Sequence, residues 1–201
     1  GLFTLEGKWR VVKPVLGSAM LPLFLVYLFE YIINLAMFLP LGFAIEGGRA
    51  GSPAAGRRLD ASACGKYSTM LFLYQLGAFA ARSSVWALPL PALWPLPVLQ
   101  GANAVLGLGV LHAVGGSGSA AVPAFLVYAA VLWEGLLGGC AYVNAFTAVR
   151  RRVRGRAERE LALGVTSLAD TTGITLAACI SLWLEGALLQ GLGHARPTCG
   201  G

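Results

Sequence analysis

The sequence contains few charged residues for its length. Only 12% of its 201 residues are Asp, Glu, Lys or Arg, while 57% are hydrophobic, whereas an average soluble domain carries about 25% charged residues. This balance, with a mean hydropathy of +0.71, excludes a soluble enzyme domain, a disordered tail and a nucleic-acid-binding protein. The basic residues lie mainly between long apolar segments, which is typical of a polytopic membrane protein.

Metal-binding and catalytic motifs are also missing. The four cysteines form no Cys-x-x-Cys motif and no cluster with the two histidines, so we expect no metal site. No nucleophile and base combine into a catalytic constellation. We therefore expect neither an enzyme nor a bound cofactor.

Long apolar segments are what the sequence does contain. A membrane-spanning helix needs about 20 mostly apolar residues, and no segment shows the alternating polarity of a barrel strand. We predict an all-α fold, a single polytopic transmembrane bundle of about five helices. The connection 46–66 is rich in Gly, Ala, Ser and Arg, which predicts a flexible exposed loop. The predicted spans are residues 17–41, 67–88, 93–114, 121–149 and 161–189.

The basic residues predict the orientation of the bundle. With five spans the termini lie on opposite sides, and ten Lys and Arg residues fall on the N-terminal side against five on the other. The positive-inside rule therefore places the N-terminus and the loop 150–160 in the cytosol. The arginines of this loop either act as a topology signal or bind anionic lipids or a partner. On the opposite side, Cys64 and Cys199 could pair, whereas Cys140 and Cys179 are expected to be packing residues.

Ionisable residues inside the predicted spans are the most informative ones. Each costs about 2.5–3.5 kcal/mol at the centre of a membrane helix, so they must face partner groups or a wet cavity rather than lipid. Glu30 lies about 20 Å into the first span, near the bilayer midplane, and helical spacing places Tyr27 and Asn34 on its face. The ionisable residues in question are Glu30, Arg82, Glu134 and Asp170.

Small residues share the faces of Glu134 and Asp170. Because small residues let a neighbouring helix approach closely, these two acids are expected to point at protein. Two glycines one turn apart also form a G-x-x-x-G pair in the fourth span. We predict helix-packing roles for Gly135, Gly138, Gly139 and Gly173.

Two interpretations stay open for each polar group in the membrane. The acids either make interhelical hydrogen bonds or form a substrate or proton site. Arg82 either pairs with Asp170, since both lie in the cytosolic half, or extends to the interface. Gln75 and Asn103 are expected to make interhelical hydrogen bonds. The candidates for substrate or ion binding are Glu30, Asn34, Arg82, Glu134, Asn144 and Asp170.

Four segments of the chain resemble the battenin family of membrane proteins. They are YLFEYIINLAMF (27–38), YQLGAFAARSSVW (74–86), WEGLLGGCAYVNAF (133–146) and SLADTTGITLA (167–177). This family is similar to the major facilitator superfamily. The resemblance implies that the chain is the C-terminal half of such a fold. Because the chain opens with Gly rather than Met, we expect a fragment of a longer protein, and the resemblance implies that the N-terminal half of that protein is missing here.

The resemblance also implies a function. It implies a lysosomal or vacuolar membrane, a role in luminal pH homeostasis and export of small solutes, namely glycerophosphodiesters in animals or basic amino acids in fungi. The expected partners are the lipid bilayer, the solute, protons and the missing half. The alternative is a non-transporting scaffold or trafficking regulator. The chain departs from the family pattern E-Y-x-I-N-Q-G at Leu35 and Ala36, which removes one amide. The residues that coincide with family motif positions are Glu30, Arg82, Glu134, Asn144 and Asp170.

Overall fold

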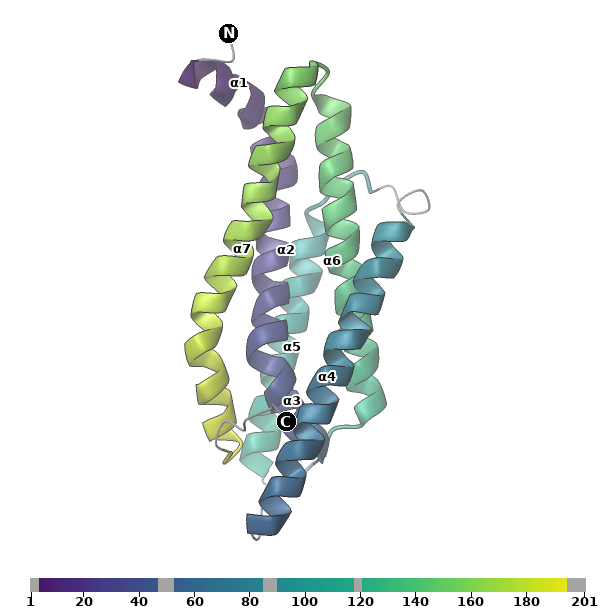
Figure 1. The fold of residues 1–201 in the computed structure, drawn as a ribbon, viewed down its shortest axis with the longest axis vertical. Coiled ribbons are helices and arrows are strands. Elements are labelled where there is room, and N and C mark those ends of the chain that lie inside the picture. The colour runs from purple at the N-terminus through teal and green to yellow at the C-terminus, as the bar shows by residue number, and fades with distance from the viewer. Residues whose placement is uncertain (1–3, 47–52, 85–89, 118–120, 195–201) are drawn as a thin grey trace.

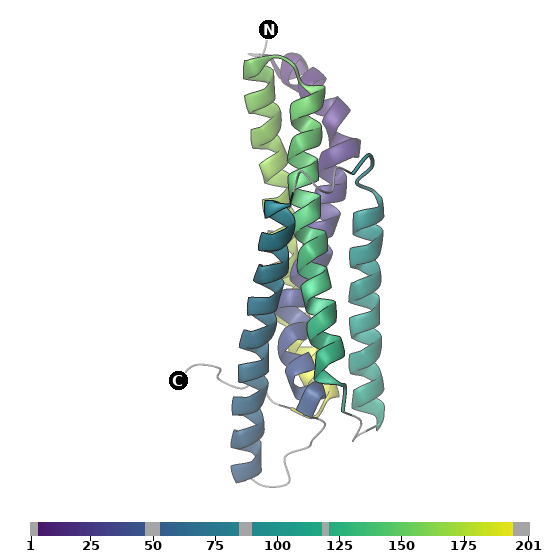
Figure 2. The same ribbon diagram turned by 90° about the vertical axis from the view of Figure 1, so that its right-hand side faces the viewer.

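The described part of the chain is a bundle of long helices (Figures 1 and 2). A computed structural model describes residues 4–46, 53–84, 90–117 and 121–194, and no strand occurs among them. The prediction of an all-α fold is therefore confirmed. The elements are α1 (Leu5–Val15), the π-helical turn η1 (Leu16–Met20), α2 (Leu21–Ile32), the π-helical turn η2 (Ile33–Met37), α3 (Phe38–Glu46), α4 (Pro53–Ser83), α5 (Pro95–Ser117), α6 (Ala124–Arg152) and α7 (Arg156–Gly191).

Four helical segments in the described ranges are long and apolar enough to cross a membrane, judged by length and composition: Leu5–Ile45, Pro95–Gly116, Ala124–Arg152 and Arg156–Gly191. The fifth long helix, α4, has 31 residues but is less apolar, because its sequence includes Lys66, Gln75 and Arg82. It packs more extensively against α6 than any other pair of helices pack together. The described part of the bundle thus contains five long helical segments, four of which are apolar enough to span a membrane.

The predicted loop 46–66 is wrong for residues 53–66, which form the first turns of α4. The segment begins with Pro, which is favoured in the first turn of a helix. Ala, Arg and Leu, which are strong helix formers, then outweigh its Gly and Ser. Cys64 in this segment is disulfide-bonded, and its predicted partner Cys199 lies outside the described residues. Cys140 and Cys179 are free thiols.

The continuous segment α2–η2–α3 runs through the middle of the bundle. α2 contacts α5, α6 and α7, and α3 contacts α4. In the most apolar stretch of Leu5–Ile45, 56% of residues are buried, against 17% in α5. Pro40 in α3 has no N–H to bond the carbonyl of Ala36 in η2, which loosens this turn. Such π-helical turns are frequent at functional sites.

α4 and α6 approach each other through glycine. A Cβ atom on Gly135 would overlap the carbonyl oxygen of Tyr74, and one on Gly139 would lie 2.6 Å from that of Ala78. From the other side, a Cβ on Gly77 of α4 would overlap α6 backbone. The two backbones are therefore in direct contact, as small residues permit in membrane bundles. This contact fixes the rotation of α6 and with it the direction of the side chains between its glycines.

Candidate functional site

A layer of buried polar side chains divides the apolar core in two. One hydrophobic cluster contains the buried residues between 15 and 27 and the C-terminal half of α6, and the other contains η2, α3 and the N-terminal half of α6. Between the two clusters lie four polar residues whose exposed fractions are only 0–4%. Glu134 is about 15 Å along α6, half the thickness of a bilayer core. We define the central polar layer as Glu30, Asn34, Gln100 and Glu134.

Each member of the central polar layer has a buried polar atom without a hydrogen-bond partner among the described residues. These are one carboxylate oxygen of Glu30 (Oε2), one of Glu134 (Oε1), Oδ1 of Asn34 and Nε2 of Gln100. Buried polar atoms are rarely left unpaired, and each one costs about 1–3 kcal/mol. These four atoms are able to form hydrogen bonds with water or with a ligand.

Glu30 lies where α2, α4 and α6 meet. Its side chain is fully buried, and the hydroxyl of Tyr74 on α4 donates a hydrogen bond of 2.5 Å to its Oε1. On the other side, the carboxylate packs so closely against Gly138 of α6 that a Cβ there would overlap both of its oxygens. The absence of a side chain at position 138 is therefore what makes room for this acid.

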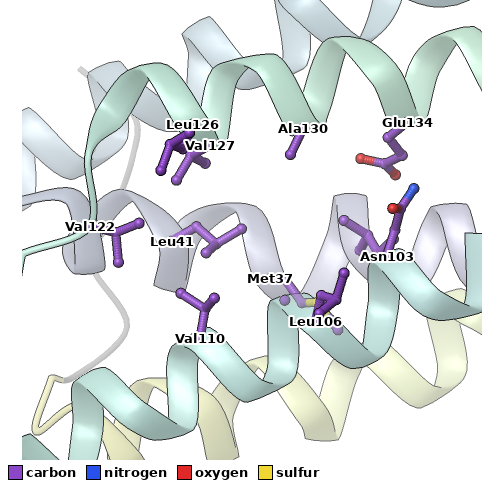
Figure 3. Close-up of a pocket in the computed structure, with 12 residues that line it drawn as sticks. Met37, Leu41, Asn103, Leu106, Val110, Val122, Leu126, Val127, Ala130 and Glu134 are labelled. Atoms are coloured by element: carbon purple, nitrogen blue, oxygen red, sulfur yellow. The ribbon is translucent and has the colours of Figure 1, made fainter.

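Glu134 lies one turn before Gly138 on α6 and borders a cavity. Glu30 packs against this same Gly138, so the two carboxyl groups lie about one helical turn apart along α6. The cavity measures about 340 Å³ and is lined by η2, α3, α5 and α6. Figure 3 shows Glu134 and Asn103 pointing toward each other at one end, while Val122 and Leu126 lie at the other. The cavity is thus apolar along its length and polar where it meets the central polar layer.

Arg82 is held by aromatic rings rather than by an acid. One guanidinium nitrogen donates a hydrogen bond of 3.1 Å to the hydroxyl of Tyr27. The guanidinium carbon lies 4.8 Å from the centre of the Tyr142 ring, a cation–π distance. Tyr27 in turn lies 6.4 Å from Tyr142 and 6.0 Å from Tyr31, between ring centres. We call Tyr27, Tyr31, Arg82 and Tyr142 the arginine–tyrosine group.

The predicted ion pair between Arg82 and Asp170 is wrong. In the described structure the carboxylate of Asp170 instead accepts hydrogen bonds from Thr171, from its N–H at 2.8 Å and from its hydroxyl at 3.4 Å. Gly173, on the same face of α7, packs against α2, where a Cβ would lie 2.7 Å from the carbonyl of Phe24. Asp170 is therefore half-buried beside α2. Arg82 donates its hydrogen bond to the hydroxyl of Tyr27 instead of pairing with Asp170.

The side chain of Asn144 forms hydrogen bonds with backbone groups. Its Oδ1 accepts a hydrogen bond of 2.9 Å from the N–H of Leu90, and its Nδ2 donates one of 2.9 Å to the carbonyl of Cys140. The side chain thus ties the segment before α5 to α6, about 9 Å along the helix from Gly138. Of the six candidates, the structure brings together Glu30, Asn34 and Glu134, while Arg82 lies nearby and Asn144 and Asp170 lie apart.

The sequence patterns do not single out three polar residues of this region. Tyr74 and Tyr142 lie in apolar runs, where they resemble ordinary aromatic core residues, and Gln100 lies near the start of α5. Gln100 is fully buried, and its Oε1 accepts a 3.5 Å hydrogen bond from Asn103. Gln75, by contrast, is exposed on the outside of the bundle. The signal for Tyr74 was available, since it lies three residues before Gly77, which packs against α6.

The described residues hold no group of three or more His, Cys, Asp or Glu side chains that could bind a metal ion. The central polar layer offers two carboxyl groups and two amides, and the hydroxyl of Tyr74 is bonded to it. These groups can bind protons or donate and accept hydrogen bonds.

The fold and this layer define a multi-pass helical membrane protein with acids buried at its centre. The sequence model of the CLN3 protein family matches residues 2–190. The chain belongs to this family, and the resemblance to battenins inferred from the sequence is confirmed.

Several relatives place the match in context. The chain is 36% identical to protein btn-1 of Neurospora crassa over 198 residues, covering 98% of this chain and 39% of that protein. It is 39% identical to protein BTN1 of Yarrowia lipolytica over 178 residues, covering 88% and 41%. It is 33% identical to battenin of Canis lupus familiaris over 184 residues, covering 90% and 37%. The chain thus spans about two fifths of the length of these relatives, and no solved structure matches it.

Proposed function

We propose that the chain forms half of a membrane carrier that exports small organic solutes from a lysosome or vacuole, with protons bound and released by Glu30 and Glu134. The central polar layer supports this most strongly, because carboxyl groups on two helices are buried in it and one of them, that of Glu134, lines a cavity. The missing half would close the solute path, and rocking of the two halves would give alternating access. Coupled movement of protons would contribute to luminal pH homeostasis.

Helix packing alone is a poor explanation for two acids in this layer. An acid at the bilayer centre costs about 2.5–3.5 kcal/mol, and an apolar residue of similar size often packs there at lower free energy. No cation lies within ion-pair distance of either carboxyl group among the described residues. Glu134 borders the cavity while Glu30 lies toward Tyr74. Together they form a two-step path for a proton across the layer.

The arginine–tyrosine group favours an anionic solute. Arg82 is exposed on the bundle surface, and its one hydrogen bond in the described structure uses one of five N–H donors. The remaining donors suit the two oxygens of a phosphodiester or a carboxylate. A glycerophosphodiester, whose net charge is zero or negative, therefore fits this group better than a basic amino acid, whose net positive charge Arg82 would repel.

A scaffold or trafficking role is the second candidate. It is favoured by exposed arginines near the α6–α7 turn whose guanidinium groups have no partner in the described residues: Arg150, Arg151 and Arg154. If this were the main function, only changes to these arginines would produce a phenotype.

Solute efflux from proteoliposomes separates the two proposals. The full-length protein is reconstituted in vesicles loaded with radiolabelled glycerophosphocholine or lysine and exposed to a pH difference. Glu134→Gln should abolish efflux while leaving membrane insertion intact, because the amide keeps the size of the side chain but binds no proton. Glu158→Gln, at an exposed position in the first turn of α7, is the matched control and should transport normally. Wild-type efflux from the Glu134→Gln protein would refute the carrier proposal.

A further inference from the structure

Helix α1 departs from the rest of the bundle. Figure 1 shows it leaning away from the bundle axis beside the turn that joins α6 to α7, and it contacts α7. Leu5 and Trp9 lie one turn apart on the same face and are 87% and 54% exposed. Val15, at the other end of the helix, is buried. α1 is therefore anchored at its C-terminal end, and its N-terminal turns present an apolar stripe that the described residues do not cover.

Basic residues flank this stripe and continue onto the α6–α7 turn. The segments 4–16 and 150–160 together contain nine Lys and Arg residues and three Glu residues. Some of the arginines are occupied locally. Arg156 pairs with Glu160 at 3.2 Å, Arg159 donates to the carbonyls of Val153 and Arg154 at 3.1 and 3.0 Å, and Arg152 donates to Ser18.

The remaining basic side chains are exposed and have no partner among the described residues. We call these six residues the basic cap: Lys8, Arg10, Lys13, Arg150, Arg151 and Arg154. The basic cap lies at one end of helices that are long and apolar enough to span a membrane. In a bilayer, that end of the helices lies at the depth of the lipid headgroups. An amphipathic helix with a tryptophan on its apolar face and basic residues beside it is typical of an element lying in the membrane interface.

We propose that α1 and the basic cap form a binding site for anionic phospholipid headgroups. Leu5 and Trp9 enter the boundary between headgroups and acyl chains, and the cap contacts the lipid phosphates. A membrane lipid presents an anionic group next to an apolar phase, which is the order that this surface requires. The hydrogen bond from Arg152 to Ser18 in η1 connects the site to the start of α2, so a bound lipid also holds the helix that carries Glu30.

Native mass spectrometry of the full-length protein, titrated with phosphatidylserine or phosphatidylcholine, tests this site. We expect the protein to prefer phosphatidylserine, and soluble glycerophosphoserine not to compete for the site. The triple variant Arg150→Gln, Arg151→Gln, Arg154→Gln should bind phosphatidylserine about 10- to 100-fold more weakly. The charge-matched control Arg57→Gln, Arg58→Gln, Lys66→Gln in α4 should bind like the wild type. Equal binding of both lipids, or equal losses in the two triple variants, would overturn the proposal.

A second measurement addresses the apolar stripe without altering the cap. In vesicles that contain lipids brominated near the headgroup, part of the tryptophan fluorescence should be quenched, and Trp9→Tyr should remove part of that quenching. If another segment or a partner protein covers the stripe instead, the wild type and Trp9→Tyr will show the same quenching. That result would contradict the lipid assignment.

Discussion

The contact between Gly138 and Glu30 leads to a sharp prediction for Gly138→Ala. The new methyl group would overlap both carboxylate oxygens of Glu30. Neither side yields easily, because Gly138 belongs to the α6 backbone that packs on α4. Glu30 is fully buried, and its Oε1 is held by Tyr74 at 2.5 Å. The carboxyl group must therefore move away from Tyr74, or α6 must move away from α2.

The expected cost follows from these contacts. Overpacking a core by one methyl group costs about 1–3 kcal/mol, and leaving Glu30 and Tyr74 unpaired costs about 1–3 kcal/mol more. Replacing Gly by Ala within a helix returns about 0.5–1 kcal/mol. We expect the free energy of unfolding to fall by about 1–5 kcal/mol in total.

Denaturant unfolding in mixed micelles, followed by tryptophan fluorescence, measures this change. The matched control is Gly109→Ala on α5, where a Cβ would meet nothing within 4 Å. It should leave stability unchanged or raise it by about 0.5–1 kcal/mol. In a double-mutant cycle with Glu30→Ala, the two changes should couple by at least about 1 kcal/mol, because removing the carboxyl removes the overlap. Equal stability of the two alanine variants, or strict additivity in the cycle, would refute this account of the contact.

Three further predictions concern neighbouring groups. Tyr74→Phe removes the hydrogen bond to buried Glu30 and should destabilise the fold by about 1–3 kcal/mol in the same unfolding assay, whereas Tyr128→Phe, which breaks no hydrogen bond in the described structure, should not. Asn144→Ala frees the N–H of Leu90 and should cost about 1–3 kcal/mol, with faster hydrogen exchange at that amide as the independent readout. Arg82→Lys keeps the charge but weakens the contact with Tyr142 and the two-point binding of an anion. Its KM for a glycerophosphodiester should rise about 5- to 30-fold, and an unchanged KM would remove Arg82 from solute binding.

The membrane helices and the inward-facing acids could be predicted because their signals are local. An apolar run of about 20 residues is visible without knowing its neighbours, and the cost of an acid in lipid applies wherever it lies in the run. The small residues that share a helix face with Glu134 likewise predicted a contact with a neighbouring helix. The first turns of α4 were missed because Gly, Ser and Arg occur both in linkers and in helices, and composition alone did not separate the two.

The partners of the polar groups could not be predicted, because they depend on helix rotation. Counting residues places Arg82 and Asp170 at similar depth, but each residue turns a helix by about 100°. The π-helical turns η1 and η2 shift the phase of the first segment further, and no sequence pattern marked them. Rotation brings Tyr27 rather than Asp170 to Arg82, and it brings Tyr74 to Glu30. The orientation of the bundle and its likeness to a facilitator half stay predictions.

Infrared difference spectroscopy on the reconstituted full-length protein tests whether Glu30 and Glu134 exchange protons as solute moves, because protonated carboxylic acids give a distinct carbonyl band. Addition of glycerophosphocholine should change this band in the wild type, and Glu30→Gln and Glu134→Gln should each remove part of the change, while Glu158→Gln should not. A band that is identical with and without solute, or one unaffected by either variant, would contradict a proton-carrying role for these two acids.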